Sequence, residues 1–499
     1  ELKMHLQECF PITNTGIKTL STTLGSLRQI SKLDIDFGLC DNLTNDGLSL
    51  LALGIQRLRS LTYLNLNFAK CEYLTDNTLQ SLALSIRGLP HLIYLMLNFS
   101  KCDLLTNNSI KAVSSSLKLL RNLSQLHLYF RGCNSIDDIG VEALSTALHE
   151  LKGITDLTLD FSKCTEITGL SLSSLALAIK EMNFLSSLII GFDGCLEIDD
   201  LGFQHLNTAI YGLKQLNILN LHFYGCTQIG DTGIESFAAT LKELHSLGQL
   251  TLSFSKCSNI SDASIKSLSQ ALSGLKFLID LKISFEQCKL ITNEGLKEFA
   301  EAVKNLNKLT ILNLFFRGCD TIGDTGFQAL AASIKELKLL TDLKLGLQEC
   351  KFLSNAGVQY LADAIKELKV LSILSLFLED CVLVDDTGLE YIANSVKQIP
   401  ILNDLLLGLQ KCKMITDNGI ATLNSSFKTL EQLATLSIYV DECENLTDAS
   451  IDNLSKTLQE MKNLVRVYLD FNGCYFISAD ALPKLKEDLS NHKFLSICV

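Results

Sequence analysis

The amino-acid sequence predicts an α/β solenoid shaped as a horseshoe, with a parallel sheet on its concave face and helices on its convex face. Three observations support this fold class. A cysteine recurs every 31 residues, apolar residues alternate before each of these cysteines, and an apolar helical stripe follows each one. A fixed period of this length is typical of solenoids, in which each repeat buries its apolar face only against its neighbours.

Sixteen of the 17 cysteines carry the period, without insertion or deletion. They are Cys9, Cys40, Cys71, Cys102, Cys133, Cys164, Cys195, Cys226, Cys257, Cys288, Cys319, Cys350, Cys381, Cys412, Cys443 and Cys474. The chain has only four prolines and no Gly/Ser-rich or charge-rich stretch that could serve as a linker. We therefore expect residues 1–499 to form one solenoid of about 16 repeats.

The repeat around Cys133 shows the elements expected in every unit. Residues 126–130 alternate apolar with polar side chains, which predicts a short strand. Apolar residues then recur three and four apart over 141–148, which predicts a helix. Strands joined by helices run parallel, with the helices on one side of the sheet. Strands lie about 4.8 Å apart whereas helices need about 8–10 Å, so the array should curve with the strands inside.

A short polar residue begins each predicted helix. Asp or Asn stands five residues after the cysteine in 14 of 16 repeats, as in Asp138 and Asp324. We expect this side chain to cap the helix that it precedes. The alternative, a calcium ladder, is less favoured because one carboxylate per repeat is far below the roughly six to eight oxygens that Ca²⁺ needs. Ala or Ser stands twelve residues after the cysteine in 13 of 16 repeats, which would let neighbouring helices approach closely.

The pattern resembles the leucine-rich repeat superfamily. Residues 123–148 are similar to the long, helix-containing repeats of ribonuclease inhibitor, and the Cys-x-x-Ile-Thr-Asp element at 412–417 is similar to the cysteine-containing repeats of F-box adaptors. The resemblance covers essentially the whole chain. It implies a leucine-rich-repeat horseshoe that binds proteins, but leaves the partner open because the superfamily binds many unrelated proteins.

The periodic cysteines are predicted to be small, buried, reduced side chains that close each turn. This interpretation implies a reducing, cytoplasmic compartment. A metal or redox column is the alternative. No two cysteines have the C-x-x-C spacing of common zinc sites, so we expect neither a metal nor a cofactor.

No catalytic motif is present, and we expect the protein not to be an enzyme. The chain lacks H-E-x-x-H, G-x-S-x-G and the phosphate-binding glycine motifs. His127 and His222 could face the concave side, but three repeats separate them, which is about 15 Å. A net charge of −12 argues against nucleic acid as a partner. No apolar run reaches the roughly 18 residues of a membrane span.

An aromatic shelf is the first candidate binding site. Four residues before the cysteine, aromatic residues alternate with glycines on successive strands: Phe315, Gly346, Phe377, Gly408 and Tyr439. Arg317, Leu406 and Tyr468 are predicted to lie alongside. Exposed aromatic and Arg side chains often dominate protein–protein binding. Alternatively, each ring covers the backbone of its glycine neighbour, and the two interpretations are compatible.

A second candidate combines Tyr129 and Arg131 with His222 and Tyr224, further along the predicted concave face. The element 129–133 recurs as 315–319, six repeats later. Duplication of a block of repeats would also explain this recurrence.

These observations predict a non-enzymatic scaffold that binds a protein partner on its concave face or rim. Two alternatives remain. The chain could be the recognition or sensor region of a larger protein, such as a ubiquitin-ligase adaptor or a kinase-linked receptor. It could also be an enzyme regulator, either an inhibitor or a GTPase activator. Association with the cytoskeleton or cilia is compatible with each of these.

Both ends of the chain fall inside predicted strands. Leu2 and Met4 already follow the strand pattern, and Cys498 stands where the strand leucine of a further repeat is expected. Neither end shows a polar cap of the kind that normally closes a solenoid. We therefore expect the sequence to be part of a longer polypeptide or of a multi-subunit assembly that covers its ends.

Overall fold

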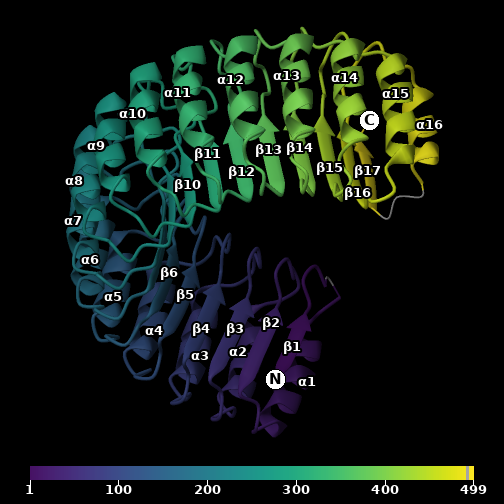
Figure 1. The fold of residues 1–499 in the computed structure, drawn as a ribbon. Helices are drawn as coiled ribbons and strands as arrows, with labels where there is room; N and C mark the ends of the chain where they lie inside the picture. Colours follow the sequence, from purple (N-terminus) through teal and green to yellow (C-terminus); the bar gives the residue numbers. More distant parts are fainter. Residues whose placement is uncertain (10, 491–493, 499) are drawn as a thin grey trace. The chain divides into compact units, whose positions relative to one another are not determined.

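A computed structural model describes residues 1–9, 11–490 and 494–498. Within them, seventeen strands alternate with sixteen helices (Figure 1). Contacts divide the chain into two compact units. The N-unit comprises Glu1–Leu247 and Thr251–Ser253, and the C-unit comprises Gly248–Leu250 and Phe254–Val499.

The strands of the N-unit are β1 (Leu2–His5), β2 (Lys32–Asp36), β3 (Tyr63–Asn67), β4 (Tyr94–Asn98), β5 (Gln125–Tyr129), β6 (Asp156–Asp160), β7 (Ser187–Gly191) and β8 (Ile218–His222). Its helices are α1 (Asn14–Ser26), α2 (Asn45–Ile55), α3 (Asp76–Ile86), α4 (Asn107–Leu117), α5 (Asp138–Leu148), α6 (Gly169–Ile179), α7 (Asp200–Ile210) and α8 (Asp231–Leu241). Strand β9 (Gln249–Ser253) is divided between the units.

The strands of the C-unit are β10 (Asp280–Ser284), β11 (Ile311–Phe315), β12 (Asp342–Gly346), β13 (Ile373–Phe377), β14 (Asp404–Gly408), β15 (Thr435–Tyr439), β16 (Arg466–Asp470) and β17 (Phe494–Cys498). Its helices are α9 (Asp262–Leu272), α10 (Asn293–Val303), α11 (Asp324–Ile334), α12 (Asn355–Ile365), α13 (Asp386–Val396), α14 (Asp417–Phe427), α15 (Asp448–Glu460) and α16 (Ala481–Asp488).

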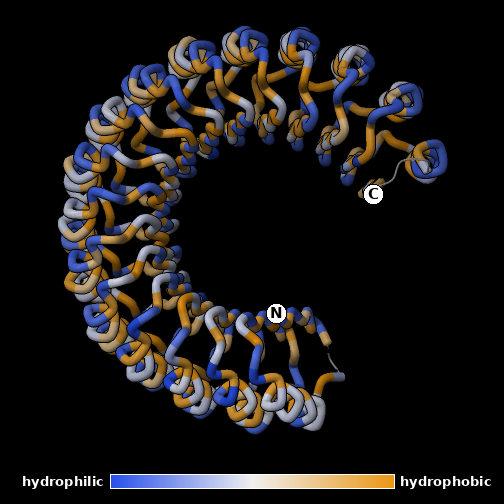
Figure 2. Tube along the Cα trace, turned by 60° about the horizontal axis from the view of Figure 1, so that its bottom comes forward, coloured by the Kyte–Doolittle hydropathy of each residue, from blue (hydrophilic) through white to orange (hydrophobic). Residues whose placement is uncertain are grey.

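Strands pair in parallel and in chain order, from β1 to β8 in the N-unit and from β10 to β17 in the C-unit. Up to β16 the register equals the sequence period, so that Leu126 lies beside Leu95 and Leu157. In each unit the helices form the outer margin and the strands the inner one (Figure 2). The predicted α/β solenoid, with a parallel sheet covered on one face by helices, is confirmed in each unit.

A column of aromatic rings fills the core of the N-unit. Phe37, Phe68, Phe99, Phe130, Phe161, Phe192 and Phe223 stand three residues before their cysteines and are fully buried. Neighbouring rings stack with centroids 5.2–6.1 Å apart. Each ring thus contacts the repeats on both sides, which is how a solenoid holds successive units together.

A tight turn follows each strand from β1 to β16. The residue immediately before each of the sixteen periodic cysteines has a left-handed backbone, with φ between 54° and 77°, although only five of these residues are glycine. Around Cys71, the N–H groups of Phe68 and Lys70 donate to the carbonyls of Asn98 and Ser100 in the next repeat, at 2.7 and 2.8 Å. A non-glycine residue in this conformation costs about 1–2 kcal/mol, and the hydrogen bonds between repeats offset this cost.

The cysteines lie inside this turn, as predicted. Fifteen are buried, Cys9 is half-buried and Cys498 is exposed. The Cys71 thiol donates to the carbonyl oxygen of Phe37 in the preceding repeat at 3.3 Å, and the same contact recurs along the chain from Cys40 to Cys474. Burial raises the pKa of Cys71 to about 12, so the thiol stays protonated. The cysteine therefore joins repeats as a donor as well as filling space.

The polar residue after each cysteine acts differently from the prediction. Asp417 is the first residue of α14, whose cap is Thr416. Its carboxylate accepts from the backbone N–H of Thr447 at 2.9 Å, from the Thr447 hydroxyl at 2.6 Å, and from the Ser450 hydroxyl. The prediction that this side chain caps its own helix is wrong, because the next helix begins within its reach.

We call the Asp and Asn side chains five residues after each cysteine the carboxylate ladder. This ladder also explains why a glycine often stands two residues after its Asp or Asn. A Cβ on Gly419 would overlap Oδ1 of Asp386 in the preceding repeat. Where that position carries a hydroxyl instead, as in Ser171, the hydroxyl donates to the carboxylate of Asp138 at 2.5 Å. The ladder oxygens are thus used by the protein itself.

The last strand departs from the period. Val467 pairs with Leu495, and Cys498 pairs with Asp470. The expectation that Cys498 takes the strand leucine position is therefore wrong, because Leu495 occupies it.

Thiol labelling tests the burial of the cysteines. In the native protein, an alkylating reagent should modify Cys498 quickly and the fifteen buried cysteines slowly. Denaturation should make all of them react at similar rates, because burial and raised pKa values no longer protect them. Labelling would be followed by mass spectrometry. Rapid modification of Cys71 or Cys319 in the native state would contradict the structure.

Substitution of Asp417 tests the ladder between repeats. Asp417→Ala leaves three donors without an acceptor, so the free energy of unfolding should fall by about 2–3 kcal/mol. Asp417→Asn keeps one acceptor oxygen and should cost less. Urea denaturation would measure both changes, and equal losses would show that the acceptor geometry does not matter.

Acid should weaken the same ladder. Burial acts to raise the pKa of Asp417, but the hydrogen bonds from Ser450 and Thr447 outweigh it and hold the pKa below its ordinary value. The stabilisation is therefore complete above the ordinary aspartate value of about 3.9 and is lost as the pH falls through the lower, folded value. In Asp417→Asn this part of the acid sensitivity should be absent from pH-dependent melting curves.

Candidate protein-binding surface

The surface that could bind a partner is the face of each sheet that points away from the helices, here called the strand face. It is formed by the residues eight, six and four positions before each cysteine, while the residues between them are buried in the core. Two residues further on, between each strand and its cysteine, lies the rim position.

The aromatic shelf forms one row on the C-unit. Phe315, Gly346, Phe377, Gly408 and Tyr439 pair directly on β11 to β15. The three rings are half-buried and the two glycines are buried. A Cβ on Gly346 would lie 2.5 Å from Cδ1 of Phe315, and one on Gly408 would lie 3.2 Å from Cδ1 of Phe377. Each ring therefore covers its glycine neighbour while part of the ring remains exposed.

Leu406 and Tyr468 extend this row. Both side chains are half-buried on the strand face, on β14 and β16. Each pairs with Ser437 of β15, which lies between them. The structure thus brings Leu406, Tyr439 and Tyr468 into one neighbourhood with small residues between them.

Arg317 stands at the rim beside Phe315 and is already engaged. Its Nε and Nη2 both donate to Oε1 of Glu349, at 2.9 and 2.6 Å. The hydrogen bond with Glu349 raises the pKa of Arg317, and Glu286 and Glu379 act in the same direction. Arg317 is therefore a fixed cation at the edge of an acidic rim.

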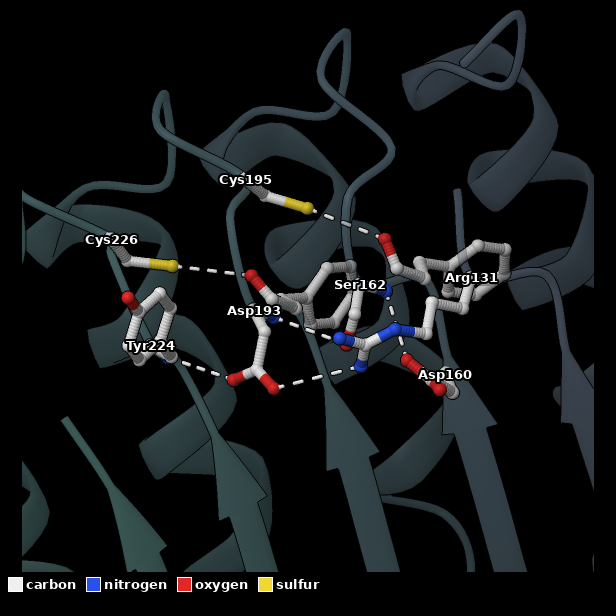
Figure 3. A network of polar contacts seen from close by, with 9 residues as sticks. Arg131, Asp160, Ser162, Asp193, Cys195, Tyr224 and Cys226 are labelled. Carbon is white, nitrogen blue, oxygen red and sulfur yellow. Dashed lines mark hydrogen bonds and ion pairs between the residues drawn. The ribbon is translucent and has the colours of Figure 1, made fainter. Parts of the chain in front are cut away.

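The second candidate set is joined by a residue that the sequence analysis missed. Asp193 lies at the rim position of β7, with Oδ2 3.8 Å from Nη1 of Arg131 and Oδ1 accepting from the backbone N–H of Tyr224 at 2.8 Å (Figure 3). Burial raises the pKa of Asp193, although Tyr224, His222 and Arg131 partly oppose this. In the sequence, Asp193 stands two residues before its cysteine, as Arg131 and Tyr224 do, and this shared position could have indicated the contact.

Tyr129 and His222 are not brought together. They lie on β5 and β8, and Asp160 and Gly191 occupy the same position on the two strands between them. The carboxylate of Asp160 accepts from the backbone N–H of Ser162 at 2.9 Å, so it holds the turn (Figure 3). Arg131, Asp193 and Tyr224 are therefore the connected part of this candidate.

A stack of rings on the N-unit was also missed. Tyr63 and Tyr94 lie on neighbouring strands with centroids 4.2 Å apart, and His127 follows at 5.1 Å. Nδ1 of His127 is 2.8 Å from the Thr158 hydroxyl, and burial lowers the pKa of His127. The signal was a tyrosine eight residues before the cysteine in two successive repeats.

The described residues contain no group of three or more His, Cys, Asp or Glu side chains placed to hold a metal ion. Over the same part of the chain, no helix has both the length and the apolar character needed to cross a membrane.

Comparison with known proteins shows similarity to solved structures. No protein-family model matches the sequence, and no curated protein matches it. A chain from the crystal structure of the Rad7 and Elc1 complex in yeast is similar, with 20% identity over 81% of this chain and 90% of that chain, and a TM-score of 0.48.

A double-mutant cycle tests the contact between ring and glycine. Gly346→Ala should destabilise the protein by about 1–3 kcal/mol, because the added methyl group displaces the Phe315 ring. In a Phe315→Ala background the same substitution should cost much less. Gly408→Ala is the milder control, since the Phe377 ring is further away. Equal costs in both backgrounds, measured by urea denaturation, would contradict the contact.

Proposed function

We propose that the protein is a non-enzymatic interaction scaffold that binds a protein partner on the strand face and adjoining rim of its C-unit. The observation that carries this proposal is the row of half-buried rings Phe315, Phe377 and Tyr439, set over glycines. Partly exposed aromatic side chains in fixed positions are typical of residues that dominate binding energy.

The rigidity of the row favours binding. Each ring stands on a strand that pairs with a neighbour on both sides. The ring also packs against the buried glycine of the neighbouring strand, which restricts the movement of the ring. Little side-chain freedom is then lost when a partner binds. Leu406 and Tyr468 would enlarge the apolar contact, and Arg317 would supply a charged edge.

The N-unit supports a secondary contact region. Arg131 and Tyr224 are joined by Asp193, and we include Tyr129 and His222 as its neighbours on the strand face. We propose the long, cysteine-containing repeat type as the subtype of the fold. Free, buried thiols in fifteen of the sixteen turns support a cytoplasmic location. Identifying the partner would distinguish three roles for the scaffold. The partner could be a ubiquitin-ligase substrate, a ligand protein that is sensed, or an enzyme that is regulated.

Partner capture with matched variants tests the proposal. The wild-type chain and Phe315→Ala, Phe377→Ala and Phe277→Ala variants would be used to recover proteins from native lysate. Each shelf variant should weaken binding of the main partner by about 1–3 kcal/mol, as for interface hot spots. Phe277 is an exposed ring at the opposite edge of the sheet, so its substitution should have no effect. Unchanged recovery with both shelf variants would refute the proposal.

A further inference from the structure

Three acceptor oxygens on the strand face of the C-unit have no donor. They are the Oδ1 atoms of Asp280 on β10, Asn313 on β11 and Asp342 on β12, and each is buried without a hydrogen-bond partner in the described part of the chain. The residues Asp280 and Asn313 are only 6% and 7% exposed. A buried acceptor without a donor is costly, so such atoms are rare unless another molecule supplies the donor.

The chain's own cations only partly satisfy this cluster. Nζ of Lys282 lies 2.8 Å from Oδ2 of Asp280, which leaves Oδ1 of the same carboxylate unused. Burial raises the pKa of Asp342, Lys344 and Lys282 act to lower it, and Asp280 and Asp404 raise it further. The carboxylate of Asp342 is therefore held in an environment that disfavours its charge.

Apolar side chains alternate with the carboxylates of the cluster: Ile311 lies between Asp280 and Asp342, and Ile373 lies on the other side of Asp342. Ile311 and Phe315 stand on β11, and Ile373 and Phe377 occupy the same positions on β13. Strand β12 between them carries Asp342, whereas its last residue is a glycine. With strands about 4.8 Å apart, the two apolar ridges are about 10 Å apart. A long cationic side chain suits this arrangement, because its methylene groups can lie on the ridges while its head meets the oxygens.

The distribution of charge over the two units also favours a cationic ligand. From β10 to β16, the strand-face positions and the two residues before each cysteine carry ten carboxylates and five cations. The same positions from β1 to β8 carry seven carboxylates and six cations. The excess of negative charge is thus concentrated on the C-unit, beside the aromatic shelf.

Asn65 and Asn220 of the N-unit also have an Oδ1 atom without a donor, but neither stands beside a carboxylate oxygen that lacks one. The combination of unpartnered amide and carboxylate oxygens is found on β10 to β12 of the described chain.

We propose that Asp280, Asn313 and Asp342 bind the ammonium or guanidinium group of a lysine or arginine side chain, supplied by a basic and partly apolar segment of the partner protein. The apolar side chains of this segment lie on Ile311, Phe315, Ile373 and Phe377. The inference rests on the proposed function, because it assigns the chemistry of the partner that the aromatic shelf binds.

A peptide-binding measurement with the full chain tests this assignment. The probe is a short fluorescein-labelled peptide in which Lys alternates with Leu, and binding is followed by fluorescence anisotropy. Two matched probes replace every Lys by Glu or every Leu by Ser, and both should bind more weakly. Asp342→Asn should weaken binding of the Lys/Leu probe about tenfold, the effect of losing one charged hydrogen bond. Lys344→Met should strengthen it, because a competing cation is removed.

Matched variants on the helix side of the same repeat separate a local site from net charge. Asp363 and Lys366 form an exposed pair at the end of α12, with Nζ and Oδ1 2.6 Å apart. Asp363→Asn and Lys366→Met change the net charge by the same amounts and should leave affinity unchanged. Asp342→Asn should also melt no lower than the wild type, since it removes a desolvated charge. Equal effects at the two sites, or an unchanged affinity with Asp342→Asn, would overturn the assignment.

Further outcomes distinguish this inference from the proposed function. Loss of partner capture with Phe315→Ala but not with Asp342→Asn would keep the scaffold and refute the cation site. No loss with either variant would refute both. Dimerisation of the chain that Asp342→Asn abolishes, seen by analytical ultracentrifugation, would show that a second copy fills the site and would overturn a separate basic partner.

Discussion

The structure depends on the hydrogen bonds that each repeat makes to its neighbours at the turn before the cysteine. The left-handed residue lets the strand end abruptly while its N–H still reaches the next repeat. The thiol of the following cysteine donates backward to the preceding repeat, so each turn is tied on both sides. One residue inserted between a strand and its cysteine would shift the turn and break its hydrogen bonds to both neighbouring repeats. This constraint explains why the spacing is constant over sixteen cysteines.

This arrangement separates stability from recognition. The core residues and the carboxylate ladder lie between the strand face and the helices, and their identities hardly vary along the chain. The strand-face side chains contribute little to the contacts that hold neighbouring repeats together, so they can differ from strand to strand. In the N-unit, Asn65 and Asn67 donate to Asp34 and Asp36, which makes that surface largely self-contained. The C-unit instead carries half-buried rings, together with a group of buried amide and carboxylate oxygens that have no donor.

Most of the fold could be predicted because periodicity reports directly on which residues are buried. Strands, helices, their parallel order and the buried cysteines follow from one repeat and the rule that identical positions stack. The ladder was misassigned because a single repeat does not show that Asp417 reaches Thr447, thirty residues later, more easily than its own helix. Among site residues, Phe315 and Phe377 were visible as large apolar residues in polar positions. Asp193 was missed because its contacts with Arg131, two repeats before it, and with Tyr224, one repeat after it, do not follow from the pattern of any single repeat. The unpaired state of Asn313 depends on side-chain packing, which no pattern reports.

The unpaired oxygens are informative because the chain could easily have avoided them. Positions equivalent to Asp342 carry isoleucine on β11 and β13 and threonine on β15, and the same solenoid forms around each of these side chains. Nothing in the turn, the core or the ladder therefore requires a carboxylate on β12. A group that the fold does not need, and whose charge burial disfavours, is expected to disappear by substitution unless another molecule compensates for its cost. This reasoning applies to the acceptor cluster and not to the ladder aspartates, whose carboxylates accept hydrogen bonds from the next repeat.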